Sequence, residues 1–157
     1  MAKGMIGLGL VLAISLTACP TTPAKTTFEG VLSAGAEFPA LPAPLPTGSG
    51  SVTVTFDGTT LTLVGTYSGL TSAPTLAHIH GPAAAGASAP PICNLKATDG
   101  ATAGSGAVSS SGAATNPCSA YLWTAQNISD LNAGNFYVNL HTTANGNGEV
   151  RAQLIKK

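Results

Sequence analysis

The strongest constraint on the fold is the alternation of apolar and polar residues in short segments that turn signals separate. Near the C-terminus, apolar residues recur at every second position over residues 136–140 and 150–154, with an Asn- and Gly-rich turn between them. Successive side chains of a β-strand point to opposite faces, so this pattern predicts an antiparallel hairpin with one apolar and one polar face. We expect the polar face, which carries Asn139, Glu149 and Arg151, to be solvated. The alternative is a binding face, because the Arg151 guanidinium can hold a carboxylate with two hydrogen bonds.

Alternating segments also fill the first half of the chain. Residues 52–56 and 61–67 alternate on both sides of Asp57-Gly58, a dipeptide typical of hairpin turns. A shorter strand is expected over residues 76–80. Many short strands with frequent turn signals predict an all-β fold, built as a single antiparallel β-sandwich or barrel-like domain.

Two later segments break the alternation. Thr124 is placed to act as the N-cap of a short helix, and Gly134 is placed to end it. Residues 96–117 are dominated by Ala, Gly, Ser and Thr, so we expect an irregular insertion there. In an exported chain, the flanking Cys93 and Cys118 are expected to form a disulfide that closes a loop of about 25 residues. The alternative is that one of these cysteines is a metal ligand.

The N-terminus carries the features of a lipoprotein signal. A short apolar run, residues 5–16, follows Lys3 and leads into Thr17-Ala18-Cys19. The run is shorter than the about 20 apolar residues of a membrane-spanning helix and has the size of a signal-peptide core. The small residues before Cys19 suit a signal peptidase, and Cys19 resembles the acceptor of lipid. An ordinary secretory signal with an incidental cysteine is the alternative.

This signal predicts the organisation of the whole chain. Residues 1–18 are expected to be a lipoprotein signal peptide, residues 19–27 a lipid anchor and tether, and residues 28–157 a single domain. Several acyl chains on Cys19 would hold the protein firmly in a membrane. The expected location is therefore the bacterial cell envelope outside the cytoplasm, on the outer membrane or the cell surface. A further partner in the envelope is not specified by the sequence.

The composition excludes several functions. Charged residues make up 8% of the chain and the formal net charge is +0, so there is no basic surface for nucleic acid. The motifs of the serine-hydrolase elbow, the phosphate-binding loop and the dinucleotide-binding turn are all missing. With six acidic residues in the chain, no carboxylate pair stands out for glycoside hydrolysis.

The three histidines form the one constellation that suits chemistry. His78 and His80 are two residues apart on a predicted strand, so they share a face, and His141 lies on the polar face of a later strand. Three imidazoles bind copper or zinc and leave a coordination position open. Glu37, Asp99 and Glu149 are the oxygen donors considered for that position. The alternative is that the histidines are structural and bind backbone carbonyls.

The chain resembles the CHRD domain family, named from chordin and also found in microbial secreted proteins. The most specific matches are His-Ile-His-Gly-Pro-Ala (78–83) and Tyr-Val-Asn-Leu-His-Thr (137–142). Further matching segments lie at residues 28–39, 67–70 and 148–154. The resemblance implies an all-β extracellular domain of the general immunoglobulin or superoxide-dismutase architecture, and it defines no activity.

Two functions fit these features. The first is a non-enzymatic binding or envelope module whose histidines are structural or hold one metal ion. The second is a small copper or zinc metalloenzyme of redox or dismutase type that uses His78, His80 and His141. The His-x-His strand is similar to the copper-ligand strand of Cu/Zn superoxide dismutase, but three histidines are too few for that enzyme's complete two-metal site.

Overall fold

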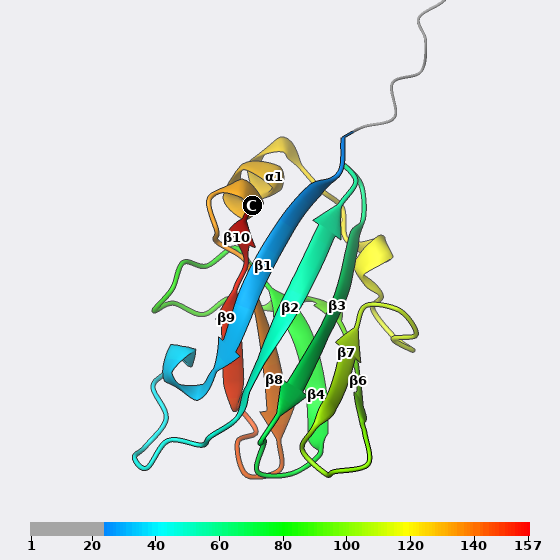
Figure 1. The fold of residues 1–157 in the computed structure, drawn as a ribbon. Helices are drawn as coiled ribbons and strands as arrows, with labels where there is room; N and C mark the ends of the chain where they lie inside the picture. Colours follow the sequence, from blue (N-terminus) through cyan, green and yellow to red (C-terminus); the bar gives the residue numbers. More distant parts are fainter. Residues whose placement is uncertain (1–23) are drawn as a thin grey trace, which may run out of the picture.

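The computed structural model describes residues 24–157, which fold into an all-β domain with one short α-helix (Figure 1). The predicted antiparallel β-fold is confirmed. The strands are β1 (Thr26–Ser33), β2 (Ser49–Phe56), β3 (Leu61–Ser68), β4 (Pro74–His80), β5 (Pro91–Asn94), β6 (Lys96–Asp99), β7 (Gly106–Ser109), β8 (Tyr137–Thr142), β9 (Val150–Gln153) and β10 (Ile155–Lys156). The α-helix, α1, is Ala125–Asn132, and 3-10 turns cover Ala34–Ala36 and Cys118–Ala120.

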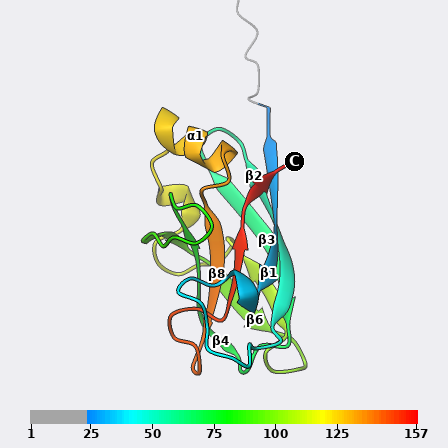
Figure 2. The same cartoon turned by 90° about the vertical axis from the view of Figure 1, so that its left-hand side faces the viewer.

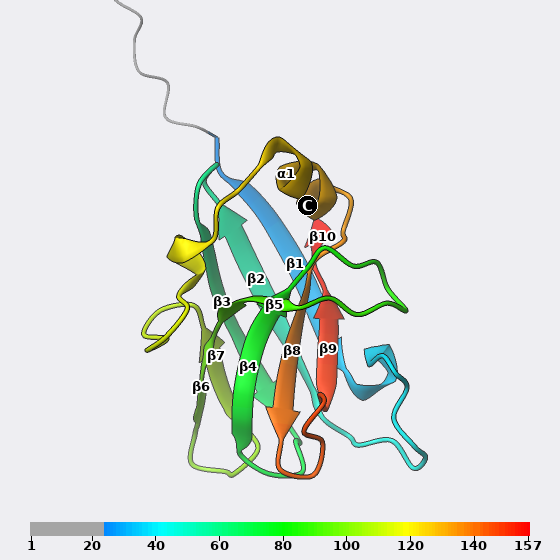
Figure 3. The ribbon, with the colours of Figure 1, turned by 180° about the vertical axis from the view of Figure 1, so that it is seen from behind.

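The strands form one continuous antiparallel sheet that curls into a nearly closed barrel. Its order is β5-β4-β8-β9-β1-β2-β3-β7-β6, with β10 paired to β1. The two edge strands, β5 and β6, are consecutive in the chain, and Leu95 between them donates its N–H to the Ala77 carbonyl of β4. Because Leu95 alone separates β5 from β6, the two edges of the sheet lie close together. Figure 1 shows the β1, β2 and β3 side of the barrel, and Figure 3 shows the opposite side, with β4, β8 and β9.

The predicted β2–β3 hairpin is confirmed. Asp57 Oδ1 accepts the N–H groups of Thr59 and Thr60, and Gly58 has a φ of 99°, a conformation that glycine adopts without strain. Alternate residues of both strands point into the barrel, where they join a mainly apolar core. Its buried side chains include Phe28, Leu32, Val54, Leu63, Ile79, Leu131, Phe136, Val138, Leu140, Val150 and Leu154.

The predicted C-terminal hairpin is also confirmed, but its polar face is not solvated. Asn139 pairs with Arg151 across β8 and β9, and their side chains are 5% and 1% exposed. Two loops, residues 34–48 and 81–90, cover this face, and Ser88 Oγ links them by donating to the Phe38 carbonyl. Figure 2 shows both loops on the β8 side of the barrel. The expectation of a solvent-exposed face was wrong because the covering loops come from distant parts of the sequence.

The segment between the cysteines is more regular than predicted. Residues 96–117 contain β6 and β7, which pair with each other, and β7 also pairs with β3. Val108 is fully buried, while most other positions carry small side chains. The predicted disulfide is present between Cys93 and Cys118, so neither cysteine is a metal ligand. It fastens β5 to the end of this segment.

Helix α1 has the predicted ends. The Thr124 side chain accepts the N–H of Asn127, and Gly134 follows the helix with a φ of 80°. Leu131 is buried and Ile128 is partly buried against the same core. Trp123, just before the helix, packs between aromatic side chains of the core and serves as a packing residue.

The N-terminal predictions lie mostly outside the described residues. The signal peptide (1–18) and the lipidated Cys19 both precede residue 24. β1 begins at Thr26, so the last two residues of the expected tether belong to the sheet. In the part of the chain from residue 24 to 157, no helix has the length and apolarity needed to cross a membrane.

Candidate metal centre

Strands β4 and β8 bring the three histidines together on the covered face of the barrel. β4 directs His78 and His80 to one side, and the β4–β8 register places His141 diagonally beside His78. The Nδ1 of His78 and the Nε2 of His141 are 3.2 Å apart. One nitrogen from each of the three rings lies within 4.8 Å of the others. The structure therefore assembles the histidine group that the sequence predicted.

Backbone carbonyls fix the orientation of two rings. His80 Nδ1 lies 2.9 Å from the Ala89 carbonyl oxygen, and His141 Nδ1 lies 3.1 Å from that of Gly146. Because a carbonyl oxygen only accepts, each Nδ1 carries the hydrogen and each Nε2 keeps its lone pair. Metal-binding histidines in proteins are commonly held by such a bond on the opposite nitrogen. Within residues 24–157, His80 Nε2 is buried and has no hydrogen-bond partner.

The spacing of the nitrogens is close to that around one ion. Two nitrogens bound at about 2.0–2.1 Å in tetrahedral geometry lie about 3.3 Å apart. The 3.2 Å between His78 Nδ1 and His141 Nε2 matches this value. The ligand nitrogen of His80 lies up to 4.8 Å from those of His78 and His141. Its ring must therefore move about 1.5 Å closer for all three nitrogens to bind one ion. In the metal-free protein, His78 Nδ1–H donates to the lone pair of His141 Nε2, and a bound ion would replace this hydrogen.

Burial keeps the three imidazoles neutral, which is the form that binds metal. Burial lowers the pKa of His80 to about 4, although its bond to the Ala89 carbonyl acts in the opposite direction. The pKa of His78 is lowered by burial and by the neighbouring His141. Burial also lowers the pKa of His141, against the effect of the Gly146 carbonyl.

Tyr137 is a supporting residue of the site that sequence reasoning missed. Its ring stacks on His80 with 4.8 Å between centroids, and the Arg151 guanidinium carbon lies 3.5 Å from the centre of the tyrosine ring. Arg151 donates to the carbonyls of Ala84 and Ala87 and so holds the 81–90 loop over the face. The signal for this role was present in the sequence, because Tyr137 shares a strand face with His141.

Glu37 reaches the same face from the 34–48 loop. Asn139 Nδ2 donates to Glu37 Oε2 over 2.9 Å. Burial raises the pKa of Glu37 to about 7, although the Asn139 bond and the charge of Arg151 both lower it. Gly148 makes room for this contact, since a Cβ there would lie 2.8 Å or less from Asn139 Nδ2, Asn139 Oδ1 and Glu37 Oε2.

Glu149, which the sequence placed on the polar face, is buried in a different environment. Its carboxylate accepts the N–H and hydroxyl of Thr71, the hydroxyl of Thr142 and the side-chain amide of Asn145. Burial raises the pKa of Glu149, but these hydrogen bonds outweigh burial and hold it below its ordinary value. Glu149 therefore stays ionised and ties β9 to the β3–β4 loop and to the turn after β8.

None of the three oxygen donors considered from the sequence joins the histidines. Among residues 24–157, the candidate metal group consists of the histidines alone. Glu37 contacts Asn139, Glu149 is saturated by its own hydrogen bonds, and Asp99 accepts the hydroxyl of Tyr67 on β3. An ion held by three imidazoles would keep a coordination position open for an exogenous ligand.

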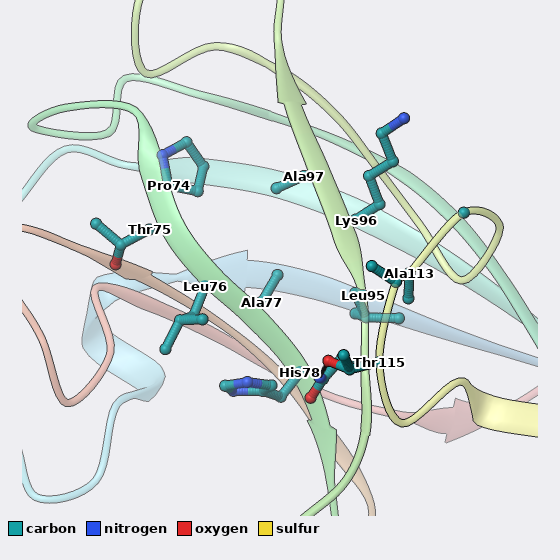
Figure 4. A pocket seen from close by; sticks show the side chains of 13 residues that line it. Pro74, Thr75, Leu76, Ala77, His78, Leu95, Lys96, Ala97, Ala113 and Thr115 are labelled. Carbon is teal, nitrogen blue, oxygen red and sulfur yellow. Dashed lines mark hydrogen bonds between the residues drawn. The ribbon is translucent and has the colours of Figure 1, made fainter. Parts of the chain in front are cut away.

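A groove of about 320 Å³ runs along β4 from Pro74 to His78, walled by β6 and residues 112–115 (Figure 4). In this view the His78 ring points away from Leu95 and Lys96, which line the other wall. The groove therefore lies beside the histidine group and not over its ligand nitrogens.

Fold and site together define a disulfide-stabilised, extracellular-type β-domain with a histidine group on a covered polar face. The CHRD domain profile matches residues 28–154, so the chain belongs to the CHRD family, as the sequence resemblance predicted. No curated protein and no solved structure matches the chain.

Proposed function

We propose that this protein is a membrane-anchored, extracytoplasmic lipoprotein whose CHRD domain is a non-enzymatic binding module that holds one metal ion at His78, His80 and His141. The observation that carries the metal proposal is the orientation of His80 and His141. Each ring donates Nδ1–H to a backbone carbonyl and directs its Nε2 lone pair towards the same space. A purely structural histidine pair would have no need to leave His80 Nε2 buried and without a partner among the described residues.

The chemistry of the ligands favours copper over zinc. Three imidazole nitrogens suit both ions, and Cu(II) binds such ligands more tightly than Zn(II) in the Irving–Williams order. With no carboxylate among the ligands, the site keeps the positive charge of the ion. We therefore expect Cu(II) to displace Zn(II) at equal concentrations.

The metal proposal is tested by titrating purified, metal-free protein with Cu(II) against a competing chelator. One ion per chain is expected, and His80→Ala should lower the affinity by at least tenfold with the fold intact. Ser88→Ala is the matched control, because it changes the same covering loop without removing a ligand. Equal affinities for the wild type and His80→Ala would refute the site.

The anchor proposal is supported by the Thr17-Ala18-Cys19 sequence after an apolar run, and the Cys93–Cys118 disulfide suits a chain folded outside the cytoplasm. Cys19→Ala should abolish the incorporation of labelled fatty acid and move the protein from the detergent phase to the aqueous phase. Thr21→Ala, next to the cleavage site, should leave both unchanged. Acylation that persists in Cys19→Ala would contradict the anchor.

The open coordination position favours a second candidate, a copper metalloenzyme of redox or dismutase type. In this structure the Arg151 guanidinium is engaged by two loop carbonyls and Gln153, so it does not guide an anion to the ion. The test is the consumption of superoxide by copper-loaded protein. A rate above that of free Cu(II), lost in His80→Ala, would favour the enzyme over the binding module.

A further inference from the structure

Glu37 and Asn139 form a buried hydrogen bond that leaves one oxygen of each side chain without a partner among residues 24–157. Asn139 Nδ2 donates to Glu37 Oε2, and the two side chains are 7% and 5% exposed. In the region that the structure describes, residues 24–157, neither Glu37 Oε1 nor Asn139 Oδ1 has a hydrogen-bond partner. Buried oxygen atoms without partners are rare in folded proteins because they have lost water and gained nothing in return.

A proton on Glu37 Oε1 would satisfy both oxygens with one hydrogen bond. When Glu37 is ionised, both spare oxygens are acceptors, and they repel each other. A protonated Oε1 becomes a donor, and Asn139 Oδ1 belongs to the same planar amide that already bonds the other carboxyl oxygen. The two groups then form a cyclic pair with two parallel hydrogen bonds. The amide and the carboxyl group both lie against Gly148, where the missing Cβ leaves space for them.

The surroundings of the pair contain few charges. Arg151 on β9 is the cation that faces it, opposite Asn139 in the sheet register. On β4, His78 lies opposite Asn139, and on β8 the neighbours on the same face are Tyr137 and His141. The histidines are neutral, and burial raises the pKa of Glu37 to about 7, in agreement with a proton held near neutral pH.

Glu149 is the other buried carboxylate among residues 24–157, and hydrogen bonds from Thr71, Thr142 and Asn145 already stabilise its negative charge. A divalent ion bound by three neutral imidazoles would therefore add charge next to the Arg151 cation with no free anion to balance it. Glu37 is the group on this face that can supply one by losing a proton.

We propose that Glu37 and Asn139 share a proton as an acid–amide pair, and that this proton leaves when the histidines bind a divalent cation. In this step the Glu37 carboxylic acid becomes a carboxylate and the proton passes to water. Asn139 Nδ2 continues to donate to the carboxylate. Cation binding is thereby favoured as the pH rises and opposed as it falls. This inference rests on the proposed metal function and adds a proton-linked control to the same site.

The test measures protons released by the full-length, metal-free protein when Zn²⁺ binds at pH 6, by calorimetry in buffers of different ionisation enthalpy. The wild type should release about one proton more per ion than Glu37→Gln, because glutamine copies the shape and donor of the protonated acid but has no proton to lose. Glu29→Gln, which removes an exposed carboxylate that pairs with Lys157, is the control and should match the wild type. Infrared spectra supply a second measurement, which requires no variant to fold. The carbonyl band of a protonated carboxylic acid should be present in the metal-free wild type and disappear on Zn²⁺ binding.

The outcomes separate the two proposals. Zn²⁺ binding with equal proton release in the wild type and Glu37→Gln would overturn the coupling and leave the metal site intact. An infrared spectrum without a carboxylic acid band at pH 6 would overturn the acid–amide pair whatever the metal does. Failure of the wild type to bind either Zn²⁺ or Cu(II) would overturn both the metal function and the coupling.

Discussion

Replacing Glu37 with glutamine should make the metal-free protein more stable at alkaline pH. The buried carboxyl group has its pKa raised from 4.5 to about 7, so the folded state holds this proton more tightly than the unfolded chain does. The unfolding free energy therefore falls as the pH rises from about 4.5 to about 7. Above that range the full destabilisation by the buried, ionised carboxylate remains. Glutamine at position 37 keeps both hydrogen bonds to Asn139 and has no proton to lose.

The magnitude follows from the shift in pKa. One pKa unit corresponds to about 1.4 kcal/mol, so the rise to about 7 corresponds to about 3 kcal/mol of unfolding free energy at pH 8. Below pH 4 both states of the wild type are protonated at Glu37, and the two proteins should be nearly equal in stability. The assay is urea unfolding at a series of pH values, with a chelator present and the disulfide intact.

Glu149→Gln is the matched control, because Glu149 is also a buried carboxylate but has its pKa lowered. Its contribution to stability is present above the unfolded pKa and is lost as the pH falls through the folded pKa. This variant should be less stable than the wild type at pH 7 by about 2 kcal/mol, as expected for lost bonds to a charged group, and the difference should shrink in acid. A difference between Glu37→Gln and the wild type that does not change with pH would refute the reasoning.

Two further predictions concern the elements that hold the site. Replacing Cys93 and Cys118 together with serine should lower the unfolding free energy by about 3 kcal/mol, the chain-entropy value for the separation of 25 residues, as measured by urea unfolding. An unchanged midpoint would contradict this. Arg151→Met should keep the volume but release the carbonyls of residues 84 and 87, so amide hydrogen exchange should accelerate in the 81–90 loop and not in β2. Unaltered exchange in that loop would show that Arg151 does not hold it.

The sequence was most informative where local pattern alone decides the structure. The alternation in β2, β3, β8 and β9 predicts each strand from a few residues, and the Asp57-Gly58 turn joins two of these strands locally. The positions of His78 and His80 on one face follow from the same period of two.

The local sequence pattern did not predict the surroundings of a residue where segments distant in the sequence pack against it. Asn139 and Glu37 are 102 residues apart in the sequence, and Arg151 donates to a carbonyl 64 residues away. The residues near the C-terminal hairpin therefore gave no indication that loops would cover its polar face. β6 and β7 were missed because most of their side chains are small, and because their place in the sheet depends on the pairing of β7 with the distant β3. The roles of Tyr137 and Glu37 became visible only with these loops in place.

The central claim is that His78, His80 and His141 bind one ion together. The most direct measurement is the electron paramagnetic resonance spectrum of the protein with one equivalent of Cu(II). We expect one copper species with hyperfine coupling to three imidazole nitrogens, and a loss of one coupled nitrogen or of binding in His80→Ala. A spectrum that shows fewer than three coupled nitrogens, or one that His80→Ala leaves unchanged, would contradict it.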